Sequence, residues 1–99
     1  MTIYKCPFEQ YAVSLDFSAD LGAGNTIASL SAVTATNNLT QADSTAEVVA
    51  PTPAPTISGT AAIFDVMGGA VGETHTISVR VVSSSGEKYQ GDITLRVAG

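Results

Sequence analysis

The fold of this chain is decided by residues 73–97, which read ETHTISVRVVSSSGEKYQGDITLRV. Polar residues alternate there with a second, mostly apolar row of side chains: His75, Ile77, Val79, Val81, Tyr89, Gly91, Ile93, Leu95 and Val97. A period of two places one row in a core and the other in water, so both halves are expected to be half-buried strands. Small residues at 83–86 form the turn between them. The stretch predicts a β-hairpin whose apolar face needs a second layer, because a lone hairpin is only marginally stable.

Strand signals recur through the rest of the chain and are separated by turn residues. Strands are expected at 11–17, 26–36, 46–49 and 57–67. Turns are expected at 18–25, at Asn37-Asn38 and at Gly68-Gly69, and residues 18–21 are compatible with one helical turn. The three prolines of 51–55 favour a stiff polyproline II crossing between two sheets over a ligand for a proline-binding domain. With no convincing amphipathic helix, this spacing is typical of a small sandwich or Greek-key barrel.

Length and composition fit one domain with a core of small aliphatic side chains. The chain has 99 residues, 44% of them hydrophobic, and no Trp. Its formal net charge is -5, and its only cations are Lys5, Arg80, Lys88 and Arg96. Because phosphate binding needs clustered Lys and Arg, we expect neither nucleic acid nor a membrane as a partner. A secretory signal pattern and an apolar run of about 20 residues are both missing, so we expect synthesis in the cytoplasm and no membrane span.

The titratable residues do not predict an active site. One His and a set of single carboxylates are not brought together at a mechanistic spacing: Glu9, Asp16, Asp20, Asp65, Glu73 and Asp92. The sequence contains no nucleophile elbow, phosphate-binding Gly-rich loop or HExxH motif. The acidic turn at 20–25 also lacks the ligand pattern of an EF-hand calcium loop. We therefore expect no enzyme activity, no catalytic residue, no cofactor and no metal.

His75, on the inward row of the hairpin, has more than one interpretation. A lone His serves as a metal ligand, as a pH switch or as a structural hydrogen-bonding residue. A second His or Cys ligand is missing nearby, although a distant ligand, Asp16 or Asp20, is left open. In Ig-like sandwiches, a Tyr near the start of the penultimate strand hydrogen-bonds back to the preceding corner. His75 lies where that Tyr would be, so we favour a role as a structural corner residue.

Residues 1–10 are interpreted as an extended N-terminal arm, because Pro7 lacks the amide that a central strand uses. The candidate partner contacts in this arm are Lys5, Cys6, Pro7 and Phe8. Cys6 is the only Cys and cannot form an internal disulfide. We interpret it as a reduced, small apolar residue, with a mixed disulfide or a packing contact to another subunit as the alternative.

Short motifs at both ends of the chain carry a family resemblance. They are Lys5-Cys6-Pro7, Leu15-Asp16-Phe17-Ser18 and Gly24-Asn25-Thr26-Ile27 at the start, and Gly72-Glu73-Thr74-His75 and Ile93-Thr94-Leu95-Arg96-Val97 at the end. These motifs resemble the opening and the last strands of small structural-module proteins of tailed bacteriophages. The chain departs from the family pattern where Cys6 replaces an Asp and His75 replaces a Tyr. The middle of the chain, residues 32–55, has no clear match.

The resemblance implies an Ig-like β-sandwich that serves in the virion or in its assembly. We therefore expect an all-β chain with a single Ig-like or fibronectin-III-like antiparallel β-sandwich at 11–99, preceded by the arm at 1–10. The implied function is a non-enzymatic structural or accessory protein of the phage virion, associated with the head, the head–tail junction or the tail. It would contact other virion proteins in multiple copies, and a homo-oligomer is compatible with this role. The alternative is a carbohydrate- or receptor-binding Ig-like module.

Overall fold

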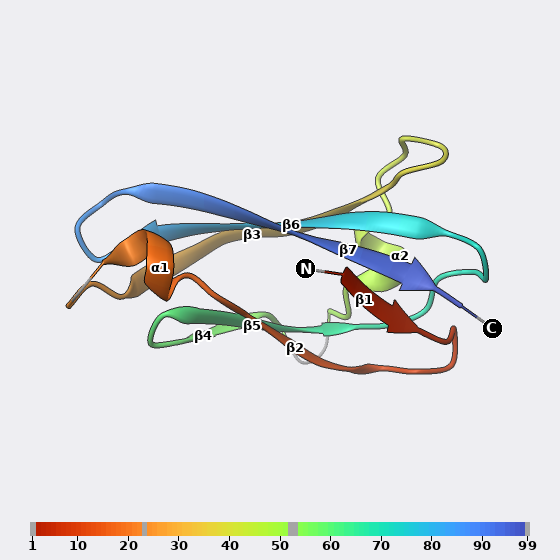
Figure 1. Cartoon of the computed structure of the whole chain (residues 1–99), viewed down its shortest axis with the longest axis horizontal. Helices are drawn as coiled ribbons and strands as arrows, with labels where there is room; N and C mark the ends of the chain where they lie inside the picture. Colours follow the sequence, from red (N-terminus) through yellow and green to blue (C-terminus); the bar gives the residue numbers. More distant parts are fainter. Residues whose placement is uncertain (1, 23, 52–53, 99) are drawn as a thin grey trace.

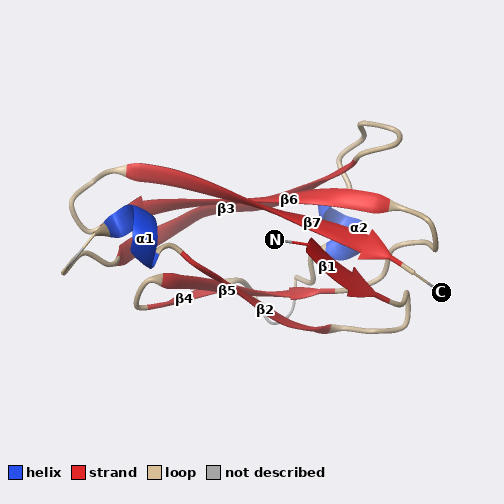
Figure 2. Ribbon diagram, in the orientation of Figure 1, coloured by secondary structure: helices blue, strands red, loops and turns tan. Residues whose placement is uncertain are grey.

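Two β-sheets face each other in the computed structural model, which describes residues 2–22, 24–51 and 54–98. Figure 1 and Figure 2 show the two layers. The larger sheet has the order β1 (Thr2–Lys5), β7 (Lys88–Val97), β6 (Thr74–Ser83) and β3 (Ile27–Asn37). The smaller sheet has the order β2 (Tyr11–Asp16), β5 (Ala61–Val66) and β4 (Thr56–Ser58). Two single helical turns, α1 (Ser18–Leu21) and α2 (Thr45–Val48), connect strands. The prediction of an all-β sandwich is confirmed at this level.

The hairpin predicted from residues 73–97 is confirmed as β6 and β7. The two strands pair antiparallel from Thr74 opposite Arg96 to Val82 opposite Lys88. The turn closes with backbone hydrogen bonds from Ser83 N to Glu87 O (2.7 Å) and from Gly86 N to Ser83 O (3.0 Å). Seven of the nine residues predicted to face inward are buried: His75, Ile77, Val79, Val81, Ile93, Leu95 and Val97. The other two, Tyr89 and Gly91, are partly buried.

The core lies between the two sheets and is filled mainly by small aliphatic side chains and two Phe rings. Phe17 and Phe64 are each 2% exposed and belong to the same apolar cluster as the inward row of the hairpin. Burying one side chain of this size contributes about 1.5–3 kcal/mol before conformational entropy is counted. At Gly91, a Cβ atom would lie 2.7 Å from Leu15 Cδ2 and 3.3 Å from the Phe17 ring. The absence of a side chain at Gly91 therefore leaves the space that Leu15 and Phe17 occupy.

The N-terminal residues are part of the sandwich, which differs from the expected arm. Thr2–Lys5 forms the edge strand β1 and pairs with β7 in parallel, with Thr2 opposite Thr94 and Lys5 opposite Val97. The strand pairs formed within 11–99 are antiparallel, as expected, whereas the parallel pair is made by β1, in residues expected to lie outside the sandwich. Pro7 does not prevent this pairing because it lies beyond the last residue of β1, where no ladder hydrogen bond is needed.

Three expectations for residues 46–67 change or stay open, and a fourth, for residues 18–21, is confirmed. The strand expected at 46–49 is wrong: Thr45 donates to Asp43 through its amide (2.9 Å) and its hydroxyl (2.6 Å), and the helical turn α2 follows. The strand expected at 57–67 is divided into β4 and β5 by a turn at Gly59, whose φ is +60°. The helical turn at 18–21 is confirmed as α1. Thr52 and Pro53 lie outside the described residues, so the polyproline II crossing at 51–55 stays a prediction.

Candidate functional site

Three loops meet at one end of the sandwich, which we call the loop end. They are residues 6–10 between β1 and β2, residues 38–44 between β3 and α2, and residues 67–73 between β5 and β6. Figure 1 shows all three on the same side as the C-terminus, whereas α1 and the β6–β7 turn lie at the opposite end. The pairing of Asn37 with His75 and of Lys5 with Val97 places the ends of these strands at one level.

Each loop of the loop end presents one large apolar side chain to solvent. The exposed fractions are 99% for Phe8, 85% for Leu39 and 63% for Val71. Single exposed apolar residues are ordinary on protein surfaces, but a group of them is a mark of an interaction site. Phe8 was among the predicted partner contacts, whereas Leu39 and Val71 were not. Their only signal in the sequence is an apolar residue close to turn residues, and the fold alone shows that the three loops lie at the same end of the sandwich.

The first loop is a tight turn that displays Phe8. The Glu9 amide donates to the Cys6 carbonyl oxygen at 3.0 Å, so Pro7 and Phe8 occupy the two central positions of a β-turn. The Cys6 amide donates to Glu9 Oε1 at 2.6 Å, which holds the turn from its other side. Cys6 is exposed and its thiol is free. A predicted partner contact is thus placed at the apex of a rigid turn.

Lys5 is buried, unlike the other candidate partner contacts. It is 2% exposed, and its Nζ atom donates to the carbonyl oxygens of Cys6 (2.7 Å) and Gly68 (2.6 Å). Desolvation by burial lowers the pKa of Lys5 below its ordinary value. The side chain is therefore unavailable for direct contact with a partner in this fold. Instead, Lys5 joins the first loop to the third through its hydrogen bond to Gly68. The backbone at Gly68 also lies close against α2, because a Cβ atom added there would be 2.5 Å from the Glu47 carbonyl oxygen.

Glu73 and Asn37 join the second loop to the third. Glu73 Oε1 accepts a hydrogen bond from the Ala70 amide at 2.7 Å, and Glu73 Oε2 accepts one from Asn37 Nδ2 at 3.0 Å. Asn37 Oδ1 in turn accepts from the Leu39 amide at 2.9 Å. The Ala70 amide, and after it the His75 ring, hold the pKa of Glu73 below its ordinary value. One carboxylate thus fixes both loops that carry Leu39 and Val71.

His75 completes this buried polar network. Its ring is fully buried, with Nδ1 2.8 Å from Ser44 Oγ and Nε2 3.1 Å from Glu73 Oε1. The inward position expected for His75 is confirmed, and its partners come from the corner before α2 and from the start of β6. A Ser, a His and a Glu in hydrogen-bonded order resemble a nucleophilic triad. Ser44, however, is 2% exposed, so substrate has no access to its hydroxyl group in this fold.

Two further carboxylates, those of Asp16 and Asp43, accept hydrogen bonds from nearby loop residues. Asp16 accepts hydrogen bonds from the Ser18 amide (2.9 Å) and the Thr60 hydroxyl (2.8 Å), and these bonds lower its pKa. Hydrogen bonds from Thr45 lower the pKa of Asp43 in the same way. Within 2–22, 24–51 and 54–98, no three side chains of His, Cys, Asp or Glu converge on a place that would hold a metal ion. The helices of these residues are also too short and too polar to cross a membrane.

The outer edge of β3 is protected against pairing with another strand. Near its C-terminal end, the Ser44 amide donates to Ala35 O at 2.8 Å and Asp43 forms a bridge with Thr36. Toward its N-terminal end, the pairing of β3 with β6 shifts register twice, between Ile27 and Ser29 and between Leu30 and Ala32. Covered backbone and bulges are both devices that keep edge strands from pairing with other chains. This edge is therefore a poor docking site compared with the loop end.

The sequence was also compared with known proteins. One protein-family model matches residues 5–96, and the family is described as podophage GP4 fiber-tail adaptor protein gp77. The matched range contains all three loops of the loop end and reaches from the last residue of β1 to the penultimate residue of β7. No curated protein matches the chain.

Proposed function

Because this chain belongs to the gp77 family of podophage fiber-tail adaptor proteins, we propose that it is a non-enzymatic adaptor that joins other proteins of the phage tail through its loop end. Family membership agrees with the resemblance to tailed-phage virion proteins and narrows the expected location to the tail of the virion. The head and the head–tail junction are no longer favoured. The partner that the family description suggests is a tail fiber.

The observation that carries the proposal is the combination of exposed apolar tips with a buried polar support. Phe8, Leu39 and Val71 are exposed, while Lys5 and Glu73 hold the loops that present them. Binding costs less entropy when the contact residues are already fixed in place. Interfaces also depend on a few large side chains near their centre, each costing about 2 kcal/mol or more when truncated. Phe8, the largest and most exposed of the three tips, fits such a role, with Leu39 and Val71 adding apolar contact at the same end.

The strand order supports the proposal that the sandwich is Ig-like. In Ig domains the second strand pairs with the fifth and the fifth with the fourth, while the third, sixth and seventh strands form the facing sheet. The orders β2-β5-β4 and β3-β6-β7 have the same connectivity. The difference is β1, which pairs with β7 instead of β2. His75, at the start of the penultimate strand, contacts Ser44 and Glu73 as a corner residue would.

The proposal is tested by replacing all three tips at once, Phe8→Ser, Leu39→Ser and Val71→Ser, in phage whose own copy of the gene is deleted. We expect the variant to fold, because the three side chains are exposed, but the particles to lack fibers in electron micrographs. Ala19→Ser, at an exposed position of α1 and at the opposite end of the sandwich, is the control and should give normal particles. Normal fibers on particles carrying the triple variant would overturn the proposal.

The alternative, a glycan-binding module, depends on aromatic side chains that are free to stack on sugar. Phe17 and Phe64 are in the core and are excluded from this role. Tyr4 and Phe8 are 65% and 99% exposed and would have to supply it. A glycan array with the purified protein, and with Phe8→Ser as control, distinguishes the two functions.

A further inference from the structure

Charge is unevenly distributed between the two outer faces of the sandwich. Three of the four cations, Arg80, Lys88 and Arg96, occupy the outward rows of β6 and β7 and are exposed. The fourth cation, Lys5, is buried. Asp92 is the carboxylate of the same outward row, so this face of the larger sheet, which we call the basic face, carries three cations and one acid. The other eight carboxylates of the chain lie elsewhere.

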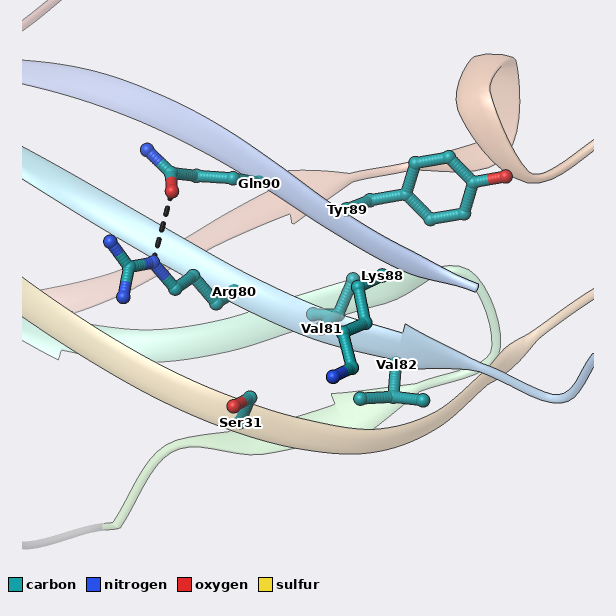
Figure 3. Close-up of a pocket in the computed structure, with 7 residues that line it drawn as sticks. All are labelled: Ser31, Arg80, Val81, Val82, Lys88, Tyr89 and Gln90. Atoms are coloured by element: carbon teal, nitrogen blue, oxygen red, sulfur yellow. Dashed lines mark hydrogen bonds between the residues drawn. The ribbon is translucent and has the colours of Figure 1, made fainter. Parts of the chain in front are cut away.

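The cations of the basic face are not neutralised within the chain. Arg80 Nε donates to the neutral Gln90 Oε1 at 2.9 Å, and within the described residues none of the three cations forms an ion pair with a carboxylate. Figure 3 shows Arg80 of β6 beside Gln90 of β7, with Lys88 also on β7 and Ser31 on β3. These residues line a pocket of about 270 Å³. A chain with nine carboxylates and four cations thus leaves its exposed cations free to meet acidic groups from outside.

The opposite face, which is the outer surface of the smaller sheet, has the complementary composition. Its outward rows hold two carboxylates, Asp16 and Asp65, small side chains, and the larger aliphatic residue Ile63, and no cation. We call it the acidic face. Asp65 pairs with Ala12 and Asp16 lies four residues further along β2, a separation of about 14 Å along the strand. The cations Lys88 and Arg96 lie eight residues apart on β7, about 27 Å, so both carboxylates fit within that length.

We propose that the basic face of one copy of this chain docks on the acidic face of a second copy. Two basic faces repel each other, and so do two acidic faces, so of the pairings between these faces charge favours only basic against acidic. This attraction acts at short range, against the repulsion between two copies that each carry a net charge of -5. The small outward side chains at Ala12, Ser14 and Ala61 surround Ile63, which adds an apolar contact at the middle of the acidic face. The contact uses neither Phe8 nor the other tips of the loop end, which stay free for another protein.

A contact between the basic face of one copy and the acidic face of the next is heterologous. An open assembly of any length therefore still has one unoccupied basic face and one unoccupied acidic face at its ends. Repetition of such a contact closes into a ring or extends as a filament, depending on its rotation. Exposed ion pairs are individually weak. The association is therefore weak in solution and strengthens when several copies are held on one particle.

The test is the mass distribution of the purified full chain in sedimentation velocity. We expect assembly at an ionic strength of about 0.01 M, where the screening length is about 30 Å, and monomers at about 1 M, where it is about 3 Å. Replacing the cations, Arg80→Gln, Lys88→Gln and Arg96→Gln, should weaken association about tenfold or more. Replacing the acids, Asp16→Asn and Asp65→Asn, should have the same effect. The matched control, Glu47→Gln with Asp20→Asn, removes two exposed carboxylates outside both faces and should still assemble.

Mixing the two defective variants gives the sharpest result. The cation variant keeps an intact acidic face and the acid variant keeps an intact basic face, so an equimolar mixture should form dimers and stop there. Monomers of the unmodified chain at low ionic strength would overturn the proposal, and so would a cation variant that assembles normally. If the unmodified chain is monomeric but binds polyglutamate or a DNA oligonucleotide through the same cations, the basic face serves an acidic partner other than a second copy. Each of these outcomes leaves the fiber test of the loop end unaffected.

Discussion

The ammonium group of Lys5 donates a hydrogen bond of 2.6 Å to the carbonyl oxygen of Gly68, across 63 positions of the chain. The bond joins the turn after β1 to the loop before β6, and both loops carry an exposed apolar tip. Lys5 was predicted to contact a partner, but in the structure it supports the loops that carry the exposed tips.

Replacing Lys5 by Met tests this support. Met keeps an unbranched apolar stem but leaves the Gly68 and Cys6 carbonyl oxygens without their donor. We expect a loss of about 1–3 kcal/mol in the free energy of unfolding, measured by chemical denaturation. Lys88→Met, at an exposed position of β7, is the control and should change stability by about 0.5 kcal/mol or less. Equal effects of the two substitutions would contradict the buried role of Lys5.

The contact between Ser44 and His75 is open to a double-mutant cycle. Ser44→Ala leaves Nδ1 of the fully buried ring without a partner and should cost about 1–3 kcal/mol of unfolding free energy. In a His75→Phe background the same substitution should cost much less, which gives a coupling energy of about 0.5–2 kcal/mol. Strictly additive effects would show that the hydrogen bond does not hold the corner before α2.

The lowered pKa of Glu73 predicts that the stability of the fold depends on pH. Its pKa in the folded protein is below the ordinary value of 4.5, mainly because of the Ala70 amide and then His75. As pH falls, the Glu73 carboxylate is therefore protonated at a higher pH in the unfolded chain than in the folded protein. The stabilisation is full above about pH 5 and disappears as pH falls through the folded-state pKa.

The measurement is the free energy of unfolding of the parent protein and of Glu73→Gln between about pH 7 and pH 3. Hydrogen bonds also lower the pKa of Asp16 and Asp43, so both proteins should lose stability in acid. The parent should lose more, and the difference isolates Glu73. Parallel curves for the two proteins would show that the hydrogen bonds to Glu73 do not favour its ionised form.

Substitutions at Gly68 and Gly86 distinguish the cost of backbone strain from the cost of a steric clash. Both have positive φ values, +55° and +91°, so an Ala at either position costs roughly 1 kcal/mol or more. Only at Gly68 would the added Cβ meet another group, the Glu47 carbonyl oxygen at 2.5 Å. Gly68→Ala should therefore lower the melting temperature clearly more than Gly86→Ala. Similar melting temperatures would mean that α2 and the loop before β6 move apart easily.

The parts of the fold that follow from local pattern were predictable, and the parts that depend on distant neighbours were not. Alternation over ten residues identified β6, β7 and the inward row that contains His75. In contrast, β1 offers four residues, and its parallel pairing with β7 has no local signal. At 43–48, the β-propensity of Val48 and Val49 was outweighed by the hydrogen bonds of Asp43 with Thr45, which start a helical turn and still bury Val48.

The candidate site was predictable only in part for the same reason. Phe8 was predicted as a partner contact, but in an extended arm and not in the turn that the structure shows. Leu39 and Val71 belong to turns far apart in the sequence, and only the sandwich brings those turns to one end. The partners of Glu73 are equally non-local, since Asn37 is 36 positions away.

The pairing of the first strand with the last sets an order of events during protein synthesis. β1 leaves the ribosome early but has no partner until β7 has been made, and contacts between such distant segments form slowly. Until then, Lys5 has no fixed position from which to reach Gly68. A chain that ends before β7 therefore lacks the organised loop end, because the strand that holds β1 and Lys5 in place is missing.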